Sequence, residues 1–238
     1  MRAEQPFSQV LDSLFNGERV IISLLFRLSD MSAEEYDQFT NRWPTVAADR
    51  RHVLTRHLAD ISEDNFRVDF SPVFAFCLGD ASSQVRLAAL DGLWDATNIA
   101  LITPILHLAQ HDEEVEVRKA AIEALGHYVL MAEWGELPKK IVPPIAEVLL
   151  ELHRGEQTDS SIRRATLEVL GAADDPRVPP LIQAAYDSGE RANQVSALFA
   201  MGRSADRRWL PAVVREMSSK FVDLRLEAAR AAGGIGAE

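Results

Sequence analysis

Apolar and small residues recur along most of this chain at a spacing that fits one face of an α-helix. From Val85, the offsets 0, 3, 4, 7 and 8 hold Val, Ala, Ala, Gly and Leu, and from Val117 the same offsets hold Val, Ala, Ala, Ala and Leu. Because a helix turns once in 3.6 residues, these positions share one face. The pattern predicts amphipathic helices, and no alternating pattern typical of strands competes with it.

The helical pattern recurs at nearly regular intervals. Related segments begin at Val85, Val117, Ile162, Asn193 and Leu224, so the steps are 32, 45, 31 and 31 residues. A proline stands 13 residues before four of these starts: Pro72, Pro104, Pro180 and Pro211. Proline is tolerated in the opening turn of a helix, so each unit is predicted to be a hairpin of two helices. One such hairpin cannot bury its apolar face alone, and neighbouring hairpins must therefore stack.

The second helix of each unit carries a recognisable signature. The spacing Asp-x5-Arg joins Asp80 to Arg86 and Asp112 to Arg118, within the pattern Val-Arg-x-Ala-Ala-x-x-Ala-Leu-Gly. These segments resemble HEAT repeats, in the short variety first named from phycobilisome-lyase subunits. The resemblance covers roughly residues 66–238 and implies an all-α fold, a right-handed α-solenoid of helical hairpins.

In that repeat family, the Asp and Arg form a hydrogen-bonded ladder between successive repeats. The resemblance assigns this structural role to Asp80, Arg86, Asp112, Arg118, Arg163 and Arg225. Later units depart from the pattern, because Gln194 replaces the Arg while Ser188 and Ser219 replace the Asp.

The ends of the chain differ from its middle. Residues 1–65 lack the signature but still predict helices, including a capping box over Ser32 to Glu35, so we expect a helical N-terminal cap with one diverged repeat. Residues 66–238 are predicted to hold about five repeats that continue from the cap as a single solenoid domain. No polar cap follows the last second helix. We therefore expect the natural protein to continue there, or this end to meet a partner or another copy.

Charge and cysteine content narrow the function classes. The chain holds 36 acidic against 25 basic residues, for a net charge of −11, which disfavours nucleic acid or anionic membrane surfaces as partners. Cys77 is the only cysteine and is predicted to be a small buried hydrophobe. With no signal peptide or membrane-spanning run, a cytoplasmic protein is expected.

Candidate catalytic chemistry is sparse. His107 and His111 stand four residues apart and could share a helical face, but an exposed polar helix end is favoured over a metal site. No His is followed by Glu, which disfavours the HEAT-like hydroxylases that hold two irons. The sequence also lacks a Gly-rich phosphate loop, a nucleophile elbow and a Cys–His pair. We therefore predict no enzyme, no cofactor and no metal site.

A binding surface is the remaining candidate. The resemblance places the second helices on the concave side of the stack, and their outward positions define a candidate ridge for a partner with basic and aromatic residues. This ridge consists of Leu87, Asp91, Trp94, Glu123, Glu168 and Phe199. A solvated charged face, with Trp94 and Phe199 filling the core, is the alternative interpretation. Trp134 and Trp209 are expected to pack near turns.

The sequence thus predicts a non-catalytic scaffold that binds a protein or peptide on the concave face. An accessory subunit of a bilin lyase, or a chaperone-like assembly factor, is the alternative. A HEAT-like nucleic-acid-binding protein comes third, because the acidity of the chain weighs against it.

Overall fold

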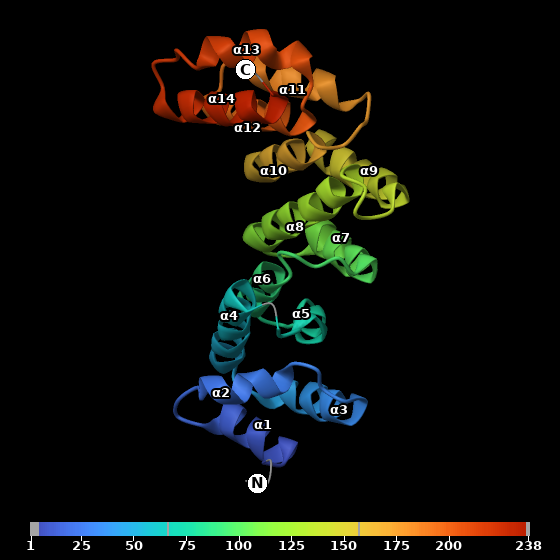
Figure 1. The fold of residues 1–238 in the computed structure, drawn as a ribbon, viewed down its shortest axis with the longest axis vertical. Coiled ribbons are helices and arrows are strands. Elements are labelled where there is room, and N and C mark those ends of the chain that lie inside the picture. The colour runs from blue at the N-terminus through green and yellow to red at the C-terminus, as the bar shows by residue number, and fades with distance from the viewer. Residues whose placement is uncertain (1–4, 66, 157, 237–238) are drawn as a thin grey trace. The chain divides into compact units, whose positions relative to one another are not determined.

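The computed structural model describes residues 5–65, 67–156 and 158–236, and every regular element in these ranges is a helix (Figure 1). The chain forms two compact units, Met1–Ala96 and Thr97–Glu238. The predicted boundary between cap and repeats, at residues 65 and 66, falls within the first unit and stays a prediction. Parts of the predicted division lie outside the described residues, namely residues 1–4, residue 66 and the terminal residues 237–238.

The described residues of the first unit form six α-helices, which are α1 (Phe7–Asn16), α2 (Ile22–Leu25), α3 (Ala33–Arg42), α4 (Ala48–Asp64), α5 (Ser71–Cys77) and α6 (Ser83–Gly92). Two 3₁₀ turns, η1 (Phe26–Leu28) and η2 (Trp43–Thr45), follow α2 and α3. Helix α1 packs against α2, α3 and α4, while α6 packs against both α5 and α4. Helix α4 therefore packs on α6 in the way that the second helix of one hairpin packs on the second helix of the next hairpin.

Aromatic residues fill the interior of the first unit. The Phe39 and Trp43 ring centroids lie 4.9 Å apart, and Phe15 packs on both rings at 6.0 and 5.8 Å. Helix α3 begins with the predicted capping box: the Ser32 hydroxyl accepts from the Glu35 N–H, and the Glu35 carboxylate accepts from the Ser32 N–H. This reciprocal pair satisfies two N–H groups that the first helical turn leaves unpaired.

In the part of the second unit that the structure describes, eight α-helices form four hairpins. These are α7 (Ile102–His111) with α8 (Val115–Glu133), α9 (Val142–Arg154) with α10 (Ser160–Leu170), α11 (Val178–Asp187) with α12 (Arg191–Ser204), and α13 (Leu210–Glu216) with α14 (Val222–Ile235). Three 3₁₀ turns, η3 (Ile99–Leu101), η4 (Lys139–Ile141) and η5 (Arg207–Trp209), lead into α7, α9 and α13. The second helices α8, α10, α12 and α14 pack in chain order, as Figure 1 shows. The predicted all-helical solenoid of stacked hairpins is confirmed.

The sequence periodicity explains this stacking. Within α6, Val85, Ala88 and Ala89 are buried, as the offsets from the start of the segment require. Proline occupies the opening turn of α5, α9, α11 and α13, where its missing N–H costs no hydrogen bond. The periodic small residues therefore mark the buried face of a second helix, and the prolines mark where first helices begin.

Glycine lets the second helices approach one another closely. A Cβ atom on Gly171, the residue that follows α10, would lie 2.7 Å from the Cα of Ala200 in α12, and one on Gly202 of α12 would lie 2.8 Å from the Cα of Ala231 in α14. Both glycines stand at offset 9 of their segments. Main chain therefore packs on main chain at this position, and no side chain fits there.

Helix α8 continues to Glu133, and its length accounts for part of the longer step of 45 residues between Val117 and Ile162. Trp209 is 5% exposed and packs as expected, but Trp134 is 68% exposed, so the packing expectation for Trp134 is wrong. The chain leaves α8 in a turn closed by main-chain hydrogen bonds from Glu136 and Leu137 to the carbonyl of Met131. This turn needs no indole to hold it. None of the described helices combines the length and apolar character needed to cross a membrane.

Candidate functional site

A groove with a volume of about 240 Å³ lies on the second-helix face of the second unit. Helices α8, α10 and α12 contribute its lining, which includes Glu123, Leu130, Glu168, Val169, Phe199 and Arg203. Three of the six predicted ridge residues thus meet in one groove: Glu123, Glu168 and Phe199. Their common position follows from offset 6 in three successive segments, which places each on the same edge of its helix.

Glu168 is the half-buried carboxyl group of this groove. Burial raises its pKa, and the nearby carboxylates Glu123 and Glu227 raise it further, against the lowering effects of the Ser196 hydroxyl and Lys119. The Ser196 hydroxyl donates a short hydrogen bond to Glu168 Oε1. The charge of Glu168 is thus incompletely compensated, and a cation brought close to it would be stabilised.

Two neighbours of Glu168, namely Ser196 and Glu227, stand at a position where the other repeats have a small packing residue. At offset 3, where earlier segments hold Ala88, Ala120 and Ala165, the last two hold Ser196 and Glu227. Both are buried, at 3% and 7% exposed. Our sequence reasoning missed them, although polar residues at an alanine position were the available signal.

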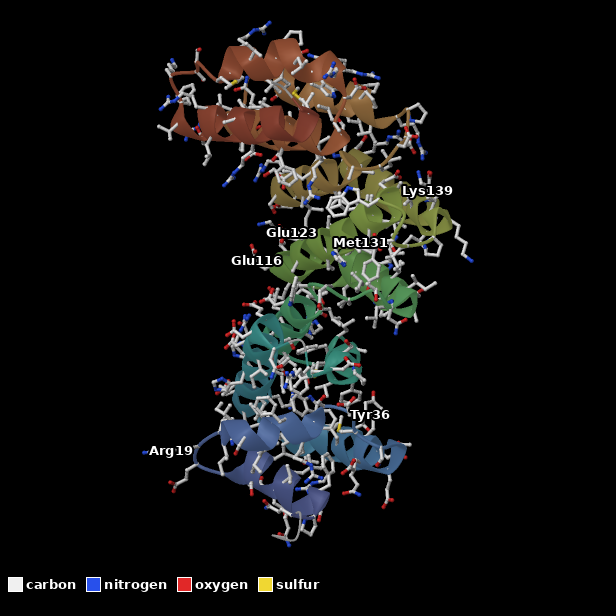
Figure 2. All side chains as sticks on the ribbon, in the orientation of Figure 1. Arg19, Tyr36, Glu116, Glu123, Met131 and Lys139 are labelled. Atoms are coloured by element: carbon white, nitrogen blue, oxygen red, sulfur yellow. The ribbon has the colours of Figure 1, made fainter. Side chains whose placement is uncertain are left out.

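The rest of the groove offers apolar surface and an aromatic ring. Val169 is buried, while Leu130 and Phe199 are half-buried. The guanidinium of Arg203 lies over the Phe199 ring, 5.2 Å from its centroid. Figure 2 shows Glu123 on the same side of α8 as Glu116 and away from Lys139, so two carboxylates share this side of the helix. Lys119 offsets part of that charge, with Nζ 3.6 Å from Glu123 Oε1.

The other predicted ridge residues belong to the first unit. Leu87 is half-buried on α6, and Trp94, just beyond α6, is 45% exposed. Asp91 pairs with Arg56 of α4 at 2.6 Å. Their role in partner binding stays a prediction.

The arginines assigned to the ladder hold the turns inside their own hairpins. Their guanidinium groups donate to main-chain carbonyls six to ten residues earlier, in the pairs Arg86–Asp80 at 2.8 Å, Arg118–Asp112 at 2.6 Å, Arg163–His153 at 3.1 Å and Arg225–Ser219 at 2.8 Å. Such bonds satisfy carbonyls that the end of a first helix leaves unpaired. The Asp80 and Asp112 carboxylates accept from the N–H two residues on, in turns that lead into α6 and α8. The ladder across repeats that was predicted for these residues stays a prediction.

A carboxylate–guanidinium pair between neighbouring hairpins involves a residue that the sequence reasoning missed. Arg51 of α4 donates to both oxygens of Asp80, at 2.8 and 2.9 Å, and the indole N–H of Trp43 donates to the same carboxylate at 2.8 Å. Arg51 precedes the recognised repeats. It lies 35 positions before Arg86 (86 − 51), close to the repeat interval, and this spacing was the signal that could have found it.

The two histidines and the cysteine that the sequence offered as candidate reactive groups lie where a structural residue would. The His107 and His111 rings are exposed on α7 with centroids 5.1 Å apart. Within the described ranges, no three or more His, Cys, Asp or Glu side chains gather as a metal site would require. Cys77 is buried as predicted, and burial raises the pKa of its thiol to about 12.

Comparisons with known proteins agree with this architecture. Residues 101–130, which include most of hairpin α7–α8, match the model of the HEAT repeat. The chain is similar to the crystal structure of an engineered protein from the Northeast Structural Genomics Consortium, with 16% identity and a TM-score of 0.55 over 87% of this chain and 97% of that one. No curated protein matches the chain.

Two designed armadillo repeat proteins give lower structural scores. YIII(Dq)4CqI has 17% identity and a TM-score of 0.49, over 83% of this chain and 98% of that one. YIII(Dq.V1)4CPAF, solved in complex with the peptide (KR)4, has 14% identity and a TM-score of 0.42, over 97% and 99%. Residues 101–130 thus contain a HEAT repeat, and further helical hairpins stack around it in an α-solenoid.

Proposed function

We propose that this protein is a non-catalytic scaffold that binds a segment of another protein along the second helices of residues 97–238. One observation carries the proposal: Glu123, Glu168 and Phe199, from three successive hairpins, line a single groove. A solvated charged face would not need a half-buried carboxyl group and a half-buried ring in the lining of a groove. Apolar walls beside incompletely compensated charge are typical of a surface that a partner covers.

The charge of the groove favours this function over nucleic-acid binding. Phosphate groups would meet the carboxyl groups of Glu123 and Glu168, and repulsion would oppose the contact. A role beside a bilin lyase, or as an assembly factor, has no structural observation behind it and stays a prediction.

A peptide library tests the proposal directly. Random peptides of about a dozen residues would be selected on the purified chain, and the affinity of a selected peptide measured by fluorescence anisotropy. The double variant Glu123→Lys with Glu168→Lys should weaken binding at least about tenfold, because it replaces attraction by repulsion at both positions.

The matched control reverses two exposed carboxylates on first helices, Glu151 of α9 and Asp187 of α11. It changes the net charge by the same amount away from the groove and should leave the affinity nearly unchanged. Failure to select any peptide, or equal losses in the two double variants, would refute the scaffold function at this surface.

A further inference from the structure

The groove already contains a cation that belongs to the chain itself. Arg203 stands in the last turn of α12, is exposed, and lies over the ring of Phe199, which is four residues earlier on the same helix. The ring attracts a guanidinium because its face carries partial negative charge. The distance of 5.2 Å to the centroid is within the range of this interaction. The ring of the groove thus accepts a guanidinium in the free protein.

The other walls suit the rest of such a side chain. An arginine has an apolar stem and a planar charged head, and long basic side chains bury the stem while the head seeks a polar partner. Leu130 and Val169 offer apolar contact for a stem, and the carboxyl groups of Glu123 and Glu168 offer acceptors for a head. Lysine fits less well, because its ammonium neither stacks on a ring as a plane nor binds a carboxylate with two parallel hydrogen bonds.

We propose that the groove takes one arginine side chain of the bound segment, and that Arg203 occupies the Phe199 ring until that arginine displaces it. This inference rests on the proposed function and specifies the chemistry of its partner. Displacement is feasible because Arg203 is exposed, so its guanidinium regains water when it leaves the ring. The partner arginine gains the ring together with the under-compensated carboxyl group of Glu168.

The test replaces the arginine of a selected peptide by citrulline, which keeps the shape of the side chain and removes its charge. Against the unmodified chain, the citrulline peptide should bind at least about tenfold more weakly. Against Glu168→Gln, the two peptides should differ much less, because the carboxylate that distinguishes them is gone. Glu123→Gln, on an exposed residue, provides the same comparison should Glu168→Gln fail to fold.

The displacement of Arg203 has its own readout. Arg203→Gln should tighten binding of the arginine peptide about threefold or more, because the competing cation is absent. Arg207→Gln is the matched control: it removes an equal charge from an exposed residue of η5 and should have little effect.

The outcomes separate the two proposals. Equal affinity for the arginine and citrulline peptides would overturn the arginine site, while a peptide still sensitive to Glu123→Lys with Glu168→Lys would leave the scaffold function standing. Weaker binding by Arg203→Gln would overturn the displacement, because it would make Arg203 a contributor to binding. A peptide that binds both double variants equally would refute the proposed function itself.

Discussion

The Asp80 carboxylate accepts two hydrogen bonds from the Arg51 guanidinium, from Nε at 2.8 Å and from Nη2 at 2.9 Å. The two side chains are only 4% and 10% exposed. The pair joins α4 to the turn before α6, so it links two hairpins through charge as well as through apolar packing. A buried pair of this kind is costly to break on one side, because the remaining charge is left in a poorly solvated place.

Arg51→Ala should therefore lower the free energy of unfolding of the first unit by about 3 kcal/mol. Urea denaturation followed by tryptophan fluorescence measures this change. Asp12→Ala is the control, since it removes an ion pair to Arg42 whose Asp side chain is 62% exposed, and it should cost less than about 1 kcal/mol. Equal losses in both variants would show that the Arg51–Asp80 pair contributes no more than a surface contact.

The same pair predicts a loss of stability in acid. Burial opposes ionisation of Asp80, but hydrogen bonds from Arg51, the Ser82 N–H and Trp43 outweigh it and lower the pKa below 3.8. The folded state therefore holds the ionised form more strongly than the unfolded chain does. The resulting stability is present above pH 3.8 and is lost as the pH falls through the lowered pKa. Urea midpoints should fall over this interval in the unmodified chain and fall less in Asp80→Asn.

The close approach of α10 and α12 predicts a position-specific effect of a single methyl group. In Gly171→Ala the new Cβ would meet main-chain atoms of Ala200, so the helices must separate, at a cost of about 1–3 kcal/mol. Gly233→Ala changes the corresponding position of the last segment, where a Cβ would meet nothing within 4 Å. This second variant should be neutral or gain up to about 1 kcal/mol from helix propensity. Thermal denaturation of both variants checks the contrast, which similar shifts would contradict.

Glu168 should contribute an opposite pH dependence. Its raised pKa means that the folded state favours the protonated form, so ionisation costs stability as the pH rises above 4.5 through the raised pKa. Glu168→Gln should therefore have a higher urea midpoint than the unmodified chain near neutral pH, and the difference should shrink below pH 4.5. A variant that is less stable near neutral pH would mean that the hydrogen bond from Ser196 to an ionised Glu168 outweighs the burial.

Cys77 should be inert in the folded protein. Burial raises the pKa of its thiol to about 12, so almost no thiolate exists near neutral pH, and the sulfur is also inaccessible. A colorimetric thiol reagent should react slowly with the native chain and fast in concentrated urea. Rapid reaction of the native chain would place Cys77 in a readily opened part of the first unit.

Most of the fold could be predicted because its determinants are local and periodic. The alanines of each second helix and the prolines of the first helices mark where elements pack and begin, and their spacing repeats. Arg51 escaped prediction because its partner, Asp80, lies 29 positions away (80 − 51) and the hairpin that carries Arg51 lacks the signature. Trp134 was expected to pack near a turn, but that turn is held by main-chain hydrogen bonds.

The groove was predictable only in part. Helical periodicity places Glu123, Glu168 and Phe199 at equivalent outward positions, and they line one groove. The placement of Arg203 over Phe199 depends on a side-chain rotamer, which spacing does not determine. The raised pKa of Glu168 depends on burial and on Glu227, two segments further along the chain, so one segment alone could not reveal it.

The glycine contacts between second helices also govern how regularly the chain can present its surface. Because Gly171 and Gly202 bring main chain against main chain, the pitch from α10 to α12 and from α12 to α14 is fixed by atoms that cannot change rotamer. Side chains on the outward faces of α10, α12 and α14 are therefore held at fixed spacings from one another. A ligand long enough to contact several of these side chains must carry its own contact residues at the same spacing. Selectivity for the length and the register of the ligand therefore follows from the absence of a Cβ atom at Gly171 and Gly202.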